Sequence, residues 1–103
     1  MAFTLRQLQF FVAAAEAASV SGAARALSIS QSSVTEAIRA LEEELGVALF
    51  ERRARGLELT HKGSLFLRHA TTILADVSTA RMAFRDEAGA MGGRLSLGVT
   101  SLV

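Results

Sequence analysis

Four stretches of the chain repeat apolar residues at helical spacing, and a serine or threonine precedes each of them. In the first stretch, Thr4 and Gln7 have the spacing of a capping box, and Phe3 and Leu8 can form the hydrophobic staple around it. The apolar residues then recur every three or four positions, which predicts a helix over residues 5–18. Its inward positions are Leu5, Leu8, Phe11, Val12 and Ala15.

A turn at residues 28–30 separates two further predicted helices. Ser21 is expected to cap the first, over residues 22–27, and Ser30 to cap the second, which Gly46 ends. Their inward positions are Ala23, Ala24, Leu27, Val34, Ile38, Leu41 and Leu45. Two short helices joined by about three residues are typical of a helix-turn-helix, and an all-α bundle segment can share the same spacing.

Apolar residues that alternate after the third helix predict a two-stranded hairpin. The residues that flank its turn at positions 53–56 are Leu49, Phe50, Leu57 and Leu59. Gly56 can adopt the positive φ that such a turn needs. The hairpin is therefore expected to form a wing that carries Arg52, Arg53 and Arg55 at its tip. These arginines form either an anion-binding edge or an ordinary solvated loop.

Thr60 is expected to cap a fourth helix over residues 61–90, about 45 Å long at 1.5 Å per residue. Its apolar residues recur at alternating steps of four and three, the spacing of a heptad seam. A helix this long cannot bury its whole apolar stripe against so small a domain. We therefore predict homodimerisation through this helix, with its first two turns packed on the domain. The seam residues are Phe66, Ala70, Ile73, Val77, Ala80 and Phe84.

The composition agrees with closely packed helices and excludes several kinds of site. Half of the 103 residues are hydrophobic, 19 are alanine, and there is no proline to break a helix. Because cysteine is absent, a disulfide scaffold, a thiolate zinc site and a cysteine nucleophile are ruled out. The longest apolar run, residues 10–15, is far shorter than a membrane span, and the N-terminus does not resemble a signal peptide. We expect a cytoplasmic chain with neither a metal nor a membrane partner.

The net charge of +1 conceals two flanks of opposite sign. Residues 36–51 contain five acidic residues and one basic residue, whereas residues 52–68 contain five basic residues and one acidic residue. Glu42, Glu43 and Glu44 lie at the end of the third predicted helix and are expected to be solvated, with Glu43 paired to Arg39 at i,i+4. The basic flank either binds an anion or pairs with acids inside the domain.

Together these motifs resemble the N-terminal domain of LysR-type transcriptional regulators. The matching residues, in order, are Leu5-x-x-Leu8-x-x-Phe11-Val12, Ser19-Val20-Ser21-x-Ala23-Ala24-x-x-Leu27, Ser30-Gln31-Ser32-x-Val34-Thr35, Leu41-Glu42-x-x-Leu45-Gly46-x-x-Leu49-Phe50-Glu51-Arg52 and Leu59-Thr60-x-x-Gly63. The resemblance covers residues 3–65 and continues to Gly93-Arg94-Leu95-x-Leu97-Gly98.

The resemblance implies a mainly α fold, in which a winged helix-turn-helix of three helices and a two-stranded wing precedes a long dimerisation helix. It divides the chain into a DNA-binding domain at 1–60, a linker helix at 61–90, and a hinge with the first strand of an absent effector domain at 91–103. Members of the family are bacterial activators or repressors that bind interrupted palindromes in double-stranded DNA. A small-molecule co-inducer is expected for the effector domain, and no cofactor for the part present.

The third helix is expected to enter the major groove with its N-terminal turns leading. The family's reading positions match Gln31, Ser32, Thr35 and Glu36, and helical geometry turns Arg39 outward beside them. The family often has proline where Ser32 stands, and a basic or amide residue where Glu36 stands. Glu36 either accepts a hydrogen bond from cytosine N4 or forms an i,i+3 pair that orients Arg39.

Phosphate contacts are expected from the wing and from the starts of helices. The residues assigned to them are Ser21, Arg25, Ser33, Arg53, Arg55 and Lys62.

Two other classes of function compete with DNA binding. An enzyme is disfavoured because His61 and His69, the only histidines, are eight residues apart on one helix, with no nucleophile or ligand spacing. A protein-interaction or dimerisation module without DNA binding would use only the heptad helix, and the wing arginines would then have no role.

Overall fold

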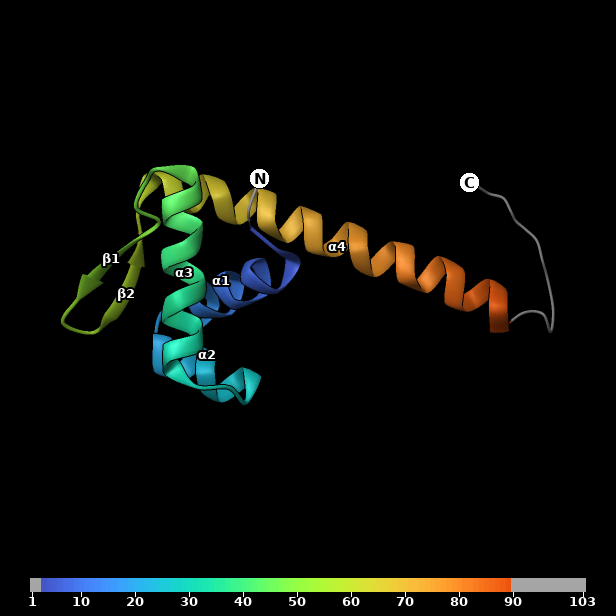
Figure 1. The fold of residues 1–103 in the computed structure, drawn as a ribbon, viewed down its shortest axis with the longest axis horizontal. Helices are drawn as coiled ribbons and strands as arrows, with labels where there is room; N and C mark the ends of the chain where they lie inside the picture. Colours follow the sequence, from blue (N-terminus) through green and yellow to red (C-terminus); the bar gives the residue numbers. More distant parts are fainter. Residues whose placement is uncertain (1–2, 90–103) are drawn as a thin grey trace.

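The computed structural model describes residues 3–89, which form four helices and one β-hairpin (Figure 1). The elements are α1 (Leu5–Ala17), α2 (Val20–Leu27), α3 (Gln31–Leu45), β1 (Phe50–Arg53), β2 (Gly56–Leu59) and α4 (His61–Gly89). This order confirms the winged helix-turn-helix with a long helix after the wing. The hinge and the strand expected within residues 91–103 lie outside the described residues.

The core lies around α1, which packs against α2, α3 and α4. Phe11 is fully buried at its centre, and its ring lies 5.3 Å from that of Phe50 and 5.2 Å from that of Phe66. On the other side, small residues of α2 let this helix approach α1 and α3 closely. The buried residues of the two clusters are Leu8, Phe11, Leu41, Leu49 and Ala70, and Ala14, Ala23, Ala24, Val34 and Ile38.

Three of the four expected helix caps are confirmed. Thr4 and Gln7 form a capping box, the Ser30 hydroxyl accepts the Ser33 amide at 3.1 Å, and the Thr60 hydroxyl accepts the Gly63 amide at 2.9 Å. The first predicted helix ends one residue early, at Ala17.

The cap expected at Ser21 is wrong, because the Ser19 hydroxyl accepts the Gly22 amide at 2.9 Å and α2 begins at Val20. Ala18 adopts a left-handed conformation with φ 53°, which reverses the chain immediately after α1. The next helix can therefore start directly after Ser19, and Ser21 lies inside its first turn with its hydroxyl 3.1 Å from that of Ser19.

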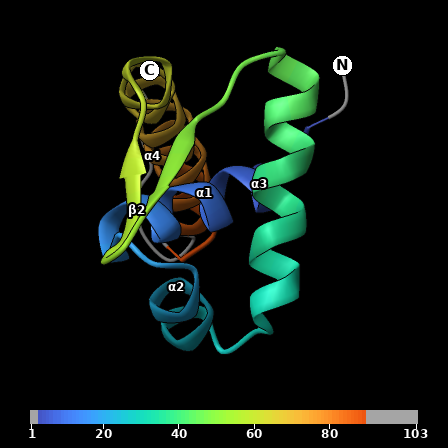
Figure 2. The ribbon, with the colours of Figure 1, turned by 90° about the vertical axis from the view of Figure 1, so that its left-hand side faces the viewer.

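The hairpin is antiparallel, with Phe50 opposite Leu59 and Arg53 opposite Gly56. Gly56 has φ 131°, and a Cβ at this position would lie 2.3 Å from the Ala18 carbonyl oxygen. The amide of the next residue, Leu57, donates to that same oxygen at 2.9 Å. The hairpin is thereby fastened to the end of α1, and Figure 2 shows it on one side of the molecule with α3 on the other.

Helix α4 begins against the core and then extends away from it (Figure 1). Its packing on the domain reaches Leu74, further than the two turns expected, because the helix crosses α1. Ala70 is 0% exposed, so the second seam residue belongs to the intramolecular core. Ile73 and Phe84, by contrast, are 36% and 74% exposed. Within residues 3–89, no helix has both the length and the hydropathy to span a bilayer.

Candidate nucleic-acid interface

The outer side of α3 is polar because four of its apolar residues face the core, whereas Leu45 in its last turn is exposed. Val34, Ala37, Ile38 and Leu41 are buried along the inner side. The five side chains predicted to read bases lie on the other side, where Gln31, Ser32, Glu36 and Arg39 are exposed and Thr35 is half-buried. The helix therefore presents hydrogen-bonding groups in a continuous stripe that begins at its N-terminus.

Three serine hydroxyls gather at the start of this stripe. The Ser30 Oγ lies 3.1 Å from the Ser32 Oγ and 2.9 Å from the Ser33 Oγ, while it caps the helix. The first turn of α3 carries no acidic residue. The partial positive charge of the helix N-terminus is consequently not neutralised by a side chain of that turn.

A cavity of about 170 Å³ separates the outer side of α3 from the hairpin. Arg39 contributes to it from α3 and Arg52 from β1, so two arginine side chains line the same space. Arg52 is opposite Leu57 in the hairpin register, and both side chains face this cavity. The remaining lining residues are Val20, Thr35, Ile38, Glu42 and Phe50.

Arg39 is not paired with the acids of its own helix. Among the residues that the structure describes, the ion pairs are those of Arg53, and they include neither Glu36 nor Glu43. The expected Arg39–Glu43 pair is therefore wrong, and an ion pair through which Glu36 would orient Arg39 is absent as well. Both glutamates are exposed, and water screens an exposed pair enough that it gains little by forming.

Glu42 is not solvated as expected but bonded to the chain that leads into the hairpin. Its Oε2 accepts the backbone amide of Leu49 at 2.8 Å and that of Phe50 at 3.4 Å. The chain reverses at Gly46, the left-handed residue that ends α3, and this brings the start of β1 back beside the last turn of the helix. The pattern that could have revealed this role is an acid four residues before a helix-ending glycine and an extended segment just after it.

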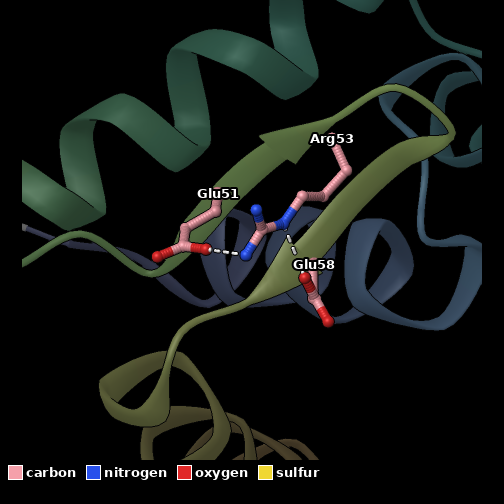
Figure 3. A network of polar contacts seen from close by, with 3 residues as sticks. All are labelled: Glu51, Arg53 and Glu58. Atoms are coloured by element: carbon pink, nitrogen blue, oxygen red, sulfur yellow. Dashed lines mark hydrogen bonds and ion pairs between the residues drawn. The ribbon is translucent and has the colours of Figure 1, made fainter.

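The wing arginines face in different directions because side chains alternate along a strand. Arg52 faces the cavity, whereas Arg53 lies on the opposite face with Glu51 (Figure 3). The Arg53 Nε donates to Glu58 Oε1 at 2.7 Å, and its Nη2 donates to Glu51 Oε1 at 2.5 Å. The hydrogen bond to Glu58 and then the charge of Glu51 raise the pKa of Arg53 above its usual value. Arg53, one of the arginines expected to contact phosphate, is thus already paired, whereas Arg52, which is not among those expected to do so, faces the cavity.

The other residues predicted to contact phosphate are distributed over four elements. Ser21, Ser33 and Lys62 lie in the first turns of α2, α3 and α4, Arg25 lies in the last turn of α2, and Arg55 lies in the hairpin turn. Arg25, Arg55 and Lys62 are exposed, and the two serines are half-buried. Among the side chains that the structure describes, no three metal-ligating groups come together.

A sequence model of one protein family matches residues 5–64, more than half of the chain, and its description is bacterial regulatory helix-turn-helix protein, lysR family. The chain belongs to the LysR family. Its 60 matched residues run from the start of α1 to the first turn of α4, so the family match includes the whole helix-turn-helix and the wing.

Relatives and solved structures of the LysR family resemble the chain over most of its length. The HTH-type transcriptional regulator TfdS of Cupriavidus pinatubonensis (strain JMP 134 / LMG 1197) is 52% identical over 88 residues, which cover 82% of this chain and 30% of TfdS. This LysR-family chain therefore spans less than a third of that relative's length.

Two similar structures are complexes with DNA. The CbnR_DBD–DNA complex has 43% identity and a TM-score of 0.73, and the match covers 85% of this chain and 99% of that one. The BenM_DBD/catB site 1 DNA complex has 36% identity and a TM-score of 0.80, with 84% and 97% covered.

Proposed function

We propose that this LysR-family chain binds double-stranded DNA sequence-specifically, as the DNA-binding part of a bacterial transcriptional regulator. The observation that carries this proposal is the polar outer side of α3, which lies beside a cavity lined by Arg39 and Arg52. Hydrogen-bonding side chains on an exposed helix suit the base edges of the major groove, and adjacent guanidinium groups suit the phosphates that flank it. The complexes of the CbnR and BenM DNA-binding domains support the same assignment.

In this proposal α3 enters the major groove with its N-terminus leading. Gln31 can make two hydrogen bonds to adenine, and Thr35 can donate to a base or contact a thymine methyl group. Arg39 can reach guanine or a phosphate from the next turn. Ser32 and Glu36 complete the set of residues that read bases.

Phosphate contacts would come from groups around α3. Arg55 and Lys62 are exposed cations in the hairpin turn and at the start of α4, and Arg25 is an exposed cation of α2. Ser21 and Ser33 would bind phosphates together with the amide groups of their helix N-termini. We add Arg52 to this set because it lines the same cavity as Arg39 and Thr35.

The protein would act as a homodimer on a palindromic operator. The partner contact would involve the later part of the seam, where Ile73, Ala80 and Phe84 are exposed and Val77 is half-buried. Phe66 and Ala70 support this contact from within the domain core. Two copies of α3 related by a two-fold axis would then read two half-sites.

The relatives are longer than this chain, and we propose that the whole protein has the same architecture. A C-terminal domain would bind a small-molecule co-inducer, and the regulator would work in the cytoplasm, where bacterial DNA lies.

The dependence of DNA affinity on salt tests the proposed binding. If Arg25, Arg52, Arg55 and Lys62 act in each subunit, a dimer neutralises about eight phosphates, and log K should fall with log salt with a slope near −7. Arg55→Gln should reduce the magnitude of that slope by about 1.8 for the dimer. Arg81→Gln, an exposed arginine on the extended part of α4, is the matched control and should leave the slope unchanged. A wild-type slope near zero would refute the proposal.

A further inference from the structure

Two carboxylates oppose each other on the outer face of the hairpin, the face turned away from the cavity. Glu51 of β1 and Glu58 of β2 are direct partners in the antiparallel register. Their side chains are 55% and 62% exposed. Like charges at directly opposite positions of two strands destabilise the pairing, so this arrangement needs a compensating cation.

Arg53 supplies that cation from the same face. It stands two residues after Glu51, so both side chains project on the same side of β1. Its Nε and Nη2 groups each donate to one of the two carboxylates, at 2.7 Å and 2.5 Å (Figure 3). The three side chains together leave a net charge of −1 on the outer face.

We propose that Arg53 is a positioning residue of the wing, which screens the Glu51–Glu58 pair, and that Arg52 and Arg55 are the wing arginines that contact phosphate. This inference rests on the proposed DNA binding. The charge of Arg53 is already shared between two carboxylates, so a phosphate would have to compete with both of them for the same cation, beside a face whose net charge is −1. Arg52 has no ion pair among the described residues, so its contact meets no such competition.

The orientation of the hairpin leads to the same assignment. Arg52 shares a cavity with Thr35 and Arg39, which lie on the outer side of α3. DNA seated on α3 therefore meets the cavity face of the hairpin, and the alternation of the strand keeps Arg53 on the other face. The wing would approach the phosphates with its cavity face and its turn.

The test compares the full chain with four variants, Arg53→Gln, Glu51→Gln/Glu58→Gln, the triple variant that combines them, and Arg52→Gln as the matched control. DNA affinity is measured for each over a series of salt concentrations. Arg53→Gln should weaken binding about threefold to tenfold at 0.1 M salt, because two unscreened carboxylates repel the backbone. It should change the slope of log K against log salt clearly less than Arg52→Gln does, because no phosphate contact and no counterion release is lost. The triple variant should recover wild-type affinity within about twofold, because it lacks the two carboxylates that would repel the DNA backbone. Arg52→Gln should reduce the slope by about 1.8 per dimer.

Hydrogen exchange of the hairpin amides provides a measurement that needs no DNA. Arg53→Gln should accelerate this exchange about twofold to fivefold, and the triple variant should restore it. The proposal is overturned if Arg53→Gln lowers the salt slope as much as Arg52→Gln does, if the triple variant stays as weak as Arg53→Gln, or if Arg53→Gln changes neither affinity nor exchange. If the DNA affinity of the wild type did not depend on salt, while hydrogen exchange changed as expected in the variants, the proposed DNA binding would be refuted. The pairing of Arg53 with Glu51 and Glu58 in the hairpin would still be supported.

Discussion

The carboxylate of Glu42 holds the backbone amide of Leu49 at 2.8 Å, and the carbonyl oxygen of Leu49 accepts the amide of Thr60 at 3.0 Å. A single buried residue is therefore bonded to α3 on one side and to the cap of α4 on the other. The Thr60 hydroxyl also donates to the carbonyl oxygen of Ala48 at 2.7 Å. Helix α3, the hairpin and helix α4 thus meet at one short segment of backbone, residues 48 and 49.

Removal of the Glu42 carboxylate should destabilise the domain. Glu42→Ala leaves the amide of the buried Leu49 without its acceptor, which costs about 1–3 kcal/mol of the free energy of unfolding. Glu42→Gln keeps a carbonyl oxygen in place and should cost less than half as much. Urea unfolding measures both, with Glu43→Ala as the control because Glu43 is exposed and unpaired among the described residues. Equal stability of the Glu42→Ala and Glu43→Ala variants would show that the bond contributes nothing.

Gly63→Ala tests the close contact between the start of α4 and the backbone of Leu49. Glycine is a poor helix former, so in an open position alanine would stabilise the first turn of α4 by up to about 1 kcal/mol. A Cβ at Gly63, however, would lie 2.0 Å from the Leu49 carbonyl oxygen. We therefore expect a loss of at least about 2 kcal/mol, from overpacking and from the shift of the hydrogen-bonded segment. A melting temperature raised by Gly63→Ala would contradict the close approach.

The order of elements could be predicted because each helix carries its own start signal and its own apolar period. Thr4, Ser30, Thr60 and Gly56 act locally, so their neighbours in the sequence suffice to predict their roles. The sequence alone places the cap of α2 wrongly because Ser19 and Ser21 compete for that role. The left-handed Ala18, which decides in favour of Ser19, follows from how α1 and α2 pack rather than from any local pattern.

The candidate site could be predicted only in part, for a similar reason. Helical periodicity sufficed to place Gln31, Thr35 and Arg39 on one side of α3. The roles of Glu42 and Arg53 depend on groups that the fold brings close, namely the amide of Leu49 seven residues away and Glu58 across the hairpin. Charge counts cannot distinguish a free arginine from a paired one, and the alternation of β1 is what separates Arg52 from Arg53.

Glu36 should determine one base preference. It is exposed on the outer side of α3 and makes no ion pair with Arg39, so its carboxylate is available to accept a hydrogen bond from cytosine N4. Glu36→Gln should change the preferred base at one position of each half-site, by about 1–3 kcal/mol of discrimination. Parallel selections of bound sequences with the wild type and the variant measure this. Identical preferences would remove Glu36 from the residues that read bases.

Phe84 should be necessary for dimerisation but not for the folding of the DNA-binding domain. It is 74% exposed on α4, beyond the part of the helix that packs against α1. Phe84→Asp should weaken dimerisation at least tenfold, because it places a charge in an apolar seam that costs more than about 1.4 kcal/mol to desolvate. Met82→Asp is the control, since Met82 is also exposed but lies off the heptad spacing. Sedimentation equilibrium distinguishes the two variants, and an unaffected dimer in Phe84→Asp would place the partner contact elsewhere.

Selection of bound sequences from a pool of random duplex DNA tests the central claim most directly. The wild-type chain should enrich one interrupted palindrome, whose half-sites are separated by about one helical turn or a multiple of it because a two-fold dimer presents two copies of α3. The same selection with Thr35→Ala should lose preference at one base pair in each half-site. A pool that remains random after repeated rounds, from a chain that is folded and dimeric, would contradict sequence-specific DNA binding.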